Sequence, residues 1–209
     1  MHLQVSNVCK SFGHGSSAKL VLDQVSFSLD SGDFKALVGS SGSGKSTVMR
    51  LIAGLDQPSS GMISMDGQPV KGPGSDRGMV FQKYSLYPWL TAAENVAFGM
   101  QMQGRSKQEV RERSSYFLDV VGLADSARRM PRELSGGMQQ RVAIARSLAA
   151  EPKLLLLDEP FGALDIQIRE SMQEFLHELW RQTGLTALLI THDLEEALLL
   201  ANEVHIMAP

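Results

Sequence analysis

The sequence predicts an α/β fold with a mainly parallel sheet, an N-terminal antiparallel β subdomain and an inserted α-helical subdomain. Three observations carry this prediction. Short aliphatic segments alternate with helical segments in the last third of the chain, which is typical of parallel strands joined by helices. The first third alternates apolar and polar residues, as half-buried strands do. Between these parts, residues 85–150 have mainly helical patterns.

Composition indicates one globular domain. Of the 209 residues, 43% are hydrophobic and 21% are charged, which is ordinary for a globular protein. We expect a core of residues 1–84 and 151–209 and a helical subdomain of residues 85–150. The net charge of −3 excludes the basic surface of a nucleic-acid-binding protein. The single cysteine, Cys9, cannot form an internal disulfide and is interpreted as a core residue.

The N-terminal residues lack a signal-peptide profile, and no apolar run reaches the ~20 residues of a membrane-spanning helix. We therefore expect another chain to supply any membrane part.

Individual elements follow from local patterns. Thr91 with Glu94, and Ser106 with Glu109, fit the capping box that starts a helix. The aliphatic run over residues 153–157 predicts a central parallel strand covered on both faces. Other predicted strands cover residues 34–38, 62–65, 78–81, 186–190 and 204–207, and other predicted helices cover residues 135–149 and 194–201 and one ended by Gly184.

Residues 39–46 have the pattern G-x-x-x-x-G-K-S between a predicted strand and a predicted helix. Glycines let backbone N–H groups approach phosphate oxygens, and the helix N-terminus adds positive potential. Lys45 can reach the β- and γ-phosphates, and Ser46 offers a hydroxyl to Mg²⁺. The alternative is a Gly/Ser surface loop. The predicted nucleotide-binding residues are Gly39, Ser40, Ser41, Gly42, Ser43, Gly44, Lys45, Ser46 and Thr47.

Two carboxylates, Asp158 and Glu159, end the aliphatic strand. In an open α/β sheet, ligands bind beyond the carboxyl ends of the strands, so these carboxylates should meet the phosphate loop. Asp158 suits the Mg²⁺ shell through a water molecule, and Glu159 would polarise the attacking water. An exposed acidic turn is the alternative.

A second glycine motif, LSGGMQQR, occupies residues 134–141 at the start of a predicted helix. Ser135 suits an N-cap, while Gly136 and Gly137 leave amides uncovered for a second phosphate site. By itself, the motif favours the simpler interpretation of a flexible helix cap.

In this combination and order, the three motifs resemble the ATP-binding subunits of ATP-binding cassette (ABC) transporters over essentially the whole chain. The resemblance implies a P-loop ATPase core, with ATP and Mg²⁺ as cofactors. Gln82 matches the family's glutamine that ligates Mg²⁺ and reports the γ-phosphate. Phe12 is the best match for the adenine-stacking aromatic, although many relatives carry tyrosine. The implied catalytic residues are Glu159, the switch histidine His192, and Lys45, and the implied metal ligands are Ser46, Gln82 and Asp158.

The resemblance also implies a head-to-tail homodimer, or a dimer with a closely related subunit. Ser135 and Gly137 of one chain would contact the γ-phosphate held by Lys45 of the other. The signature residues that would contact the partner's ATP are Ser135, Gly136, Gly137 and Gln139. The segment Ala163-Leu164-Asp165 matches the loop that contacts the opposite subunit, through Asp165. Hydrolysis would then separate the two chains.

The segment after Gln82 is unusually apolar for a connector, with Tyr84, Leu86, Tyr87, Pro88, Trp89 and Leu90. Two interpretations stay open. This segment can dock a helix of a membrane permease, or it can pack the helical subdomain against the core. A free subunit favours an importer at the cytoplasmic face of the inner membrane, with a solute-binding protein as a further partner. Residues 80–91 and 160–165 resemble the group that serves nitrate, sulfonate, taurine or bicarbonate uptake.

Two other functions remain as alternatives. One is an ABC ATPase of a non-transport membrane complex, such as cell division or lipoprotein release. The other is a non-hydrolysing, ATP-gated interaction module, against which Glu159 and His192 argue. Many relatives continue for several dozen residues beyond the last strand, which bears on dimer stability.

Overall fold

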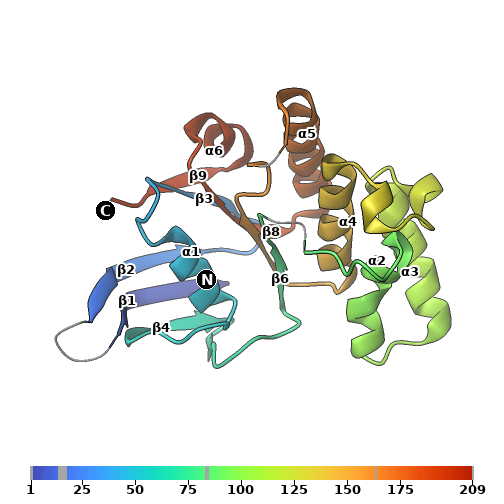
Figure 1. Ribbon diagram of the computed structural model, residues 1–209. Helices are drawn as coiled ribbons and strands as arrows, with labels where there is room; N and C mark the ends of the chain where they lie inside the picture. The colour runs from blue at the N-terminus through green and yellow to red at the C-terminus, as the bar shows by residue number, and fades with distance from the viewer. Residues whose placement is uncertain (1, 14–17, 83–84, 163, 209) are drawn as a thin grey trace.

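A computed structural model describes residues 2–13, 18–82, 85–162 and 164–208. In these ranges, five parallel strands form a sheet in the order β6-β7-β8-β3-β9 (Figure 1). Strands β3 and β8 are buried along their whole lengths, because helices or the second sheet cover both faces. The strands are β3 (Phe34–Val38), β6 (Arg77–Val80), β7 (Leu154–Asp158), β8 (Thr186–Thr191) and β9 (Glu203–Ile206).

The N-terminal part forms an antiparallel sheet in the order β2-β1-β4-β5. Its inner face carries buried residues such as Leu3 and Val5. Cys9 is only half-buried, so its interpretation as a core residue is wrong. The Cys9 Sγ accepts a hydrogen bond from the Gln24 N–H at 3.3 Å, because the strands are irregular there. The strands are β1 (Leu3–Phe12), β2 (Lys19–Leu29), β4 (Ser60–Met65) and β5 (Gln68–Pro69).

Helix α1 (Lys45–Ile52) lies between the two sheets, where Met49 and Ile52 are fully buried. Alternate residues of β7 point to opposite faces of the parallel sheet. Leu156 packs with α1, whereas Leu157 packs with α5 (Ile166–Thr183) and α6 (Leu194–Leu200). This two-sided burial explains why β7 is a continuous aliphatic run.

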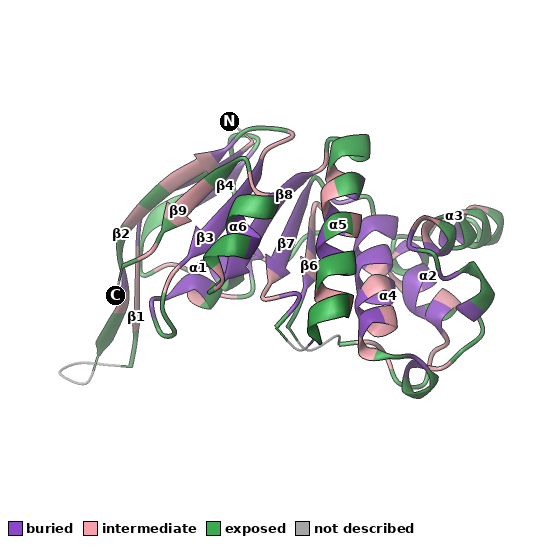
Figure 2. Cartoon of the chain, turned by 90° about the horizontal axis from the view of Figure 1, so that it is seen from above, coloured by how far each residue is buried: buried purple, intermediate pink, exposed green. Residues whose placement is uncertain are grey.

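The helical part follows β6 and precedes β7 in the chain and lies to one side of the parallel sheet (Figure 2). It has its own apolar core, which contains Val96, Leu118 and Val142. None of the described helices is long and apolar enough to cross a membrane. The helices are α2 (Ala92–Met102), α3 (Lys107–Val120) and α4 (Gly136–Ala149), with short 3₁₀ turns at Ala124–Ser126 and Pro131–Glu133.

Helix α4 belongs to both cores. Its residue Ile144 packs in the core of the parallel sheet, and its residue Val142 packs in the helical core. The subdomain boundaries at residues 84/85 and 150/151 remain a prediction, since α4 joins the two parts rather than lying wholly in one.

The first predicted capping box forms, and the second forms only in half. Thr91 Oγ1 accepts from the Glu94 N–H, and the Glu94 carboxylate accepts from the Thr91 N–H at 2.8 Å. Ser106 caps α3, but the Glu109 carboxylate accepts from Arg105 at 3.1 Å rather than from the Ser106 backbone. A nearby guanidinium thus displaces the second bond of the box. Other element ends differ from the predicted ones by one or two residues.

Asn95 of α2 fixes the segment that follows Gln82. Its side chain is fully buried. The Oδ1 atom accepts from the Tyr87 N–H at 2.8 Å, and Nδ2 donates to the carbonyls of Tyr87, Leu90 and Thr91 at 3.2, 3.0 and 3.0 Å. One amide side chain therefore lies within hydrogen-bond distance of four backbone groups of an irregular segment, and its two Nδ2 hydrogens are shared among three carbonyls.

Replacing Asn95 with alanine should lower the free energy of unfolding by about 2–4 kcal/mol, because the Tyr87 N–H and the Leu90 carbonyl lose the hydrogen bonds that the buried amide gives them. Urea unfolding followed by circular dichroism measures this loss. Gln101→Ala, on the exposed face of the same helix, is the control. Equal stability of the two variants would contradict the assigned role of Asn95.

Candidate functional site

The phosphate loop begins where β3 ends and leads directly into α1. Gly42 and Gly44 have φ angles of 85° and 93°, in the left-handed region that favours glycine. A Cβ at Gly44 would also lie 2.5 Å from Leu22 Cδ2. The glycines of the motif are therefore required by backbone conformation and by close packing against β2.

A cavity of about 220 Å³ opens over this loop, and Lys45 lies in its wall. Lys45 is 5% exposed. Its ammonium donates to the carbonyls of Gly39 and Ser40 at 2.7 and 2.9 Å and lies 3.5 Å from Ser43 Oγ. The cavity is lined by Val21, Ser41, Gly42, Gly44, Lys45, Ser46, Thr47 and Glu159, so the predicted loop residues and one strand-end carboxylate meet there.

Ser46 and Asp158 come together at the start of α1. The Ser46 hydroxyl donates to Asp158 Oδ1 at 3.3 Å. Burial raises the pKa of Asp158, and the neighbouring Glu159 charge adds to this, whereas Ser46 and Lys45 oppose it. A hydroxyl and a carboxylate side by side fit Mg²⁺, which prefers hard oxygen ligands and keeps waters and phosphate oxygens in its shell.

Glu159 is held in an unusual backbone conformation, with a φ of 43°. Its N–H donates to the Ile190 carbonyl at 2.9 Å, and its own carbonyl accepts from the Gly162 N–H at 3.2 Å. The Gln82 Nε2 donates to Glu159 Oε2 at 3.2 Å, and His192 Nδ1 lies 3.4 Å from Glu159 Oε1. The two carboxylate oxygens are therefore contacted from opposite sides.

A sequence profile of the family described as ABC transporter matches residues 22–162. The chain belongs to the ABC transporter family. The nitrate import ATP-binding protein NrtD of a Synechocystis species is 53% identical, over 100% of this chain and 78% of that protein. The taurine import ATP-binding protein TauB of Sinorhizobium fredii is 49% identical, over 94% of this chain and 74% of that protein.

Solved structures of ABC proteins agree with this assignment. A dimeric ATP-binding cassette in a post-hydrolysis state, bound to ADP and Pi, has a TM-score of 0.86 and 33% identity to this chain, over 98% of this chain and 94% of that one. The expected ABC family, the P-loop ATPase fold and the ATP-hydrolysing class of this chain are thereby confirmed.

The second glycine motif lies at the start of α4. Ser135 caps this helix, since its Oγ accepts from the Met138 N–H at 3.3 Å, and Gln139 Nε2 donates to the Leu134 carbonyl. A Cβ at Gly137 would lie 2.4 Å from Ile168 Cγ2 of α5. In the described ranges, the lining of the phosphate-loop cavity includes no residue of α4, and α1 and α4 pack against opposite faces of the parallel sheet (Figure 1).

Asp165 and Phe12 lie at the edges of the site. Asp165 caps α5 through Oδ1, which accepts from the Ile168 N–H at 3.1 Å, while Ala163 falls outside the described residues. Phe12 ends β1 opposite Lys19, and its ring is 44% exposed. Phe12 stands apart from the described lining of the phosphate-loop cavity, so its stacking role stays a prediction.

The apolar segment after Gln82 is partly used for packing. Leu86 packs against both the sheet core and the helical core. The Tyr87 ring lies 4.5 Å from the Phe98 ring, measured between centroids. Trp89, by contrast, is 69% exposed. Packing of the helical subdomain against the core is thus correct for Leu86, whereas the Tyr87 ring packs on α2 of the helical part. Docking stays a prediction for Trp89, and Tyr84 falls outside the described residues.

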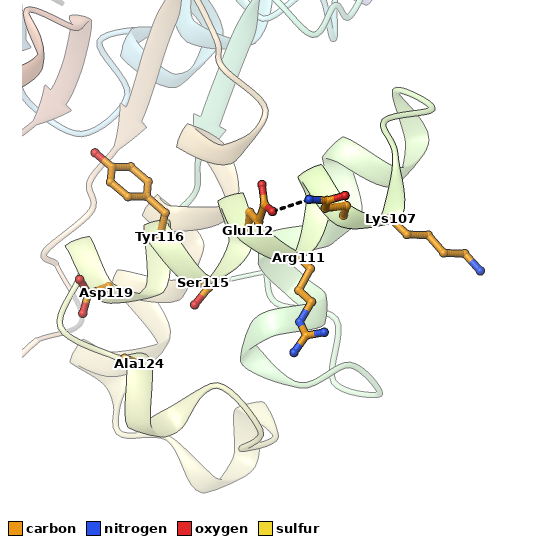
Figure 3. A pocket seen from close by; sticks show the side chains of 8 residues that line it. Lys107, Arg111, Glu112, Ser115, Tyr116, Asp119 and Ala124 are labelled. Atoms are coloured by element: carbon orange, nitrogen blue, oxygen red, sulfur yellow. Dashed lines mark hydrogen bonds between the residues drawn. The ribbon is translucent and has the colours of Figure 1, made fainter.

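A larger hollow on the outer face of α3 does not resemble a site. Its volume is about 850 Å³. Figure 3 shows Lys107 and Arg111 of its wall extending away from each other. The Gln108 amide donates to Glu112 along the same helix at 2.9 Å. The polar groups do not converge on a common point, so the hollow carries no chemical assignment.

Sequence reasoning missed the residues behind His192. A cavity of about 50 Å³ is lined by Glu159 and His192 together with Arg169, Thr191 and Glu196. Glu196 lies in the first turn of α6, four residues after His192, which precedes the N-cap Asp193. The sequence carries that spacing but no sign that this glutamate is buried.

Asp158→Asn should stabilise the nucleotide-free protein above pH 7. The pKa of Asp158 is higher in the folded protein than in the unfolded chain. Ionisation of this carboxyl therefore lowers the free energy of unfolding. This loss of stability disappears as the pH falls from the pKa of the folded state to the pKa of the unfolded state. Thermal unfolding from pH 8 to pH 4 should therefore show the variant more stable at high pH, with the difference shrinking in acid. A constant difference would contradict the assigned burial.

Proposed function

We propose that two copies of this chain, or one copy and a closely related subunit, bind and hydrolyse Mg-ATP to drive import of a small anion through separate membrane subunits. The proposal rests above all on the Glu159 carboxylate. Gln82 and His192 contact it, and it lines the phosphate-loop cavity. A carboxylate fixed beside a triphosphate site can polarise the attacking water.

The phosphate loop binds the triphosphate in this proposal. ATP brings about four negative charges, which Lys45 and the N-terminus of α1 offset. Ser40, Ser41, Ser43 and Thr47 supply loop hydrogen bonds, and Phe12 stacks on the adenine. Ser46, Gln82 and Asp158 hold Mg²⁺, with Asp158 acting through a water molecule. The metal supplies charge stabilisation at the β- and γ-phosphates.

Hydrolysis forms one bond between water oxygen and the γ-phosphorus and breaks the bond between the γ-phosphorus and the bridging oxygen. Glu159 accepts the water proton, and His192 keeps the carboxylate directed at the water. Products are ADP and inorganic phosphate, so the residues that grip the γ-phosphate lose their shared ligand.

The second chain contributes the signature residues. Ser135, Gly136, Gly137 and Gln139 of one copy contact the γ-phosphate at the other copy's Lys45, and Asp165 contacts the opposite chain. Supporting observations are the position of this motif at the N-terminus of α4 and the dimeric solved relative. Loss of the γ-phosphate then lets the copies separate, which is the mechanical step.

In the proposal, this motion is transmitted to a membrane permease at the cytoplasmic face of the inner membrane. Trp89 and Pro88 are exposed beside Gln82 and offer an apolar surface to a permease helix. Since NrtD and TauB are import proteins for nitrate and taurine, the cargo is an anion of that kind. A solute-binding protein delivers it to the permease.

Glu159→Gln should lower the ATPase rate at least about 100-fold and leave ATP binding intact, since it removes the proton acceptor but keeps the phosphate contacts. Mg-ATP should convert this variant from monomer to dimer in size-exclusion chromatography. Glu170→Gln, an exposed carboxylate of α5, is the control with normal turnover.

The added change Ser135→Arg should keep the Glu159→Gln protein monomeric with ATP bound. A double variant that still dimerises with Mg-ATP would refute the shared site.

Tagged protein extracted from native membranes should carry its permease, and proteoliposomes of the complex should take up nitrate or taurine with ATP. Trp89→Ala should lower permease recovery, whereas Tyr116→Ala, exposed on α3, should not. Recovery of a cell-division or lipoprotein-release complex instead would overturn the import assignment.

A further inference from the structure

Helix α6 carries a carboxylate where its buried face should be apolar. Glu196 is 7% exposed. Burial raises its pKa, and the Asp193 charge adds to this, while Thr191, Gln173 and Arg169 oppose it. Burying a carboxylate destabilises a fold unless specific bonds offset the loss of hydration. Stability alone therefore gives no reason for a glutamate at this position.

The bonds of Glu196 fix the residues on both sides of His192. The Thr191 hydroxyl donates to Glu196 Oε2 and accepts from the Asp193 N–H, the latter at 3.0 Å. Asp193 Oδ1 in turn accepts from the N–H groups of Glu195 and Glu196 at 2.9 and 3.2 Å. The backbone around His192 is thus closed into a ring of hydrogen bonds that includes the Glu196 carboxylate.

The His192 ring has little packing of its own. Its side chain is 64% exposed, and its Nδ1 lies 3.4 Å from Glu159 Oε1. The direction of such a ring depends on its backbone and on that contact. We propose that Glu196 is a positioning residue for ATP hydrolysis, which holds His192 against Glu159 through Thr191. This inference rests on the proposed roles of Glu159 and His192.

The same carboxylate lies between two loops of the site. Glu196 and Arg169 both line the 50 Å³ cavity behind His192. Arg169 donates to the carbonyl of Leu164 at 3.3 Å, one residue before Asp165. Among the described residues, Glu196 Oε1 and Arg169 Nε have no hydrogen-bond partner, and both belong to the wall of this cavity. Arg169 and Glu196 therefore face one cavity between the His192 loop and the Asp165 loop.

Steady-state ATP hydrolysis by the purified full chain tests the proposal. Glu196→Ala and Thr191→Val should each lower kcat about tenfold and change KM for ATP less than about twofold, because nucleotide contacts are untouched. Glu196→Gln should keep most of the activity, since its amide oxygen still accepts from Thr191. Glu195→Ala, the exposed neighbour on the same helix, is the matched control and should be unchanged.

Combination with His192→Ala separates positioning from a general structural role. If Glu196 acts through His192, adding Glu196→Ala to that variant should cost no more than about twofold in kcat. A second tenfold loss, or normal kcat in Glu196→Ala, overturns the inference and leaves the proposed function standing. Normal kcat in His192→Ala overturns both the inference and the role given to His192.

Discussion

The geometry of the site depends on one backbone hydrogen bond between neighbouring parallel strands. The Glu159 N–H donates to the Ile190 carbonyl as β7 ends beside β8. This bond continues the β7–β8 pairing by one residue and fixes where the Glu159 carboxylate leaves the sheet. Gln82 follows β6 and His192 follows β8, so the strand order β6-β7-β8 places both beside Glu159. The sheet topology thereby assembles three distant parts of the chain.

Those features of the fold and site that follow from local rules could be predicted from sequence. The glycines of residues 39–46 are required by the loop itself, and the aliphatic run before Asp158 requires a strand covered on both faces. Gln82 and His192 were identified by family resemblance, because a lone glutamine or histidine carries no signal of its own.

The features that were not predicted depend on tertiary packing. Asn95 and Glu196 belong to residue types that are usually exposed, yet both are buried. Their partners, Tyr87 and Thr191, come from loops whose course is set by neighbouring elements. The second capping box failed for a similar reason, since Arg105 competes for Glu109. Burial of a polar group reflects partner placement, which hydrophobic periodicity does not encode.

Two departures from local rules lie at the same edge of the parallel sheet. Glu159 has a positive φ, which costs about 1–3 kcal/mol for a residue with a side chain. Glu196 places a carboxylate in a largely dry environment at the next strand end. Both are kept in place by several bonds at once, through Ile190 and Gly162 for Glu159 and through Thr191 for Glu196. The surrounding fold thus offsets the backbone strain of Glu159 and the desolvation of Glu196 at two adjacent strand ends. This is expected where the positions of site residues matter more than the stability of the fold.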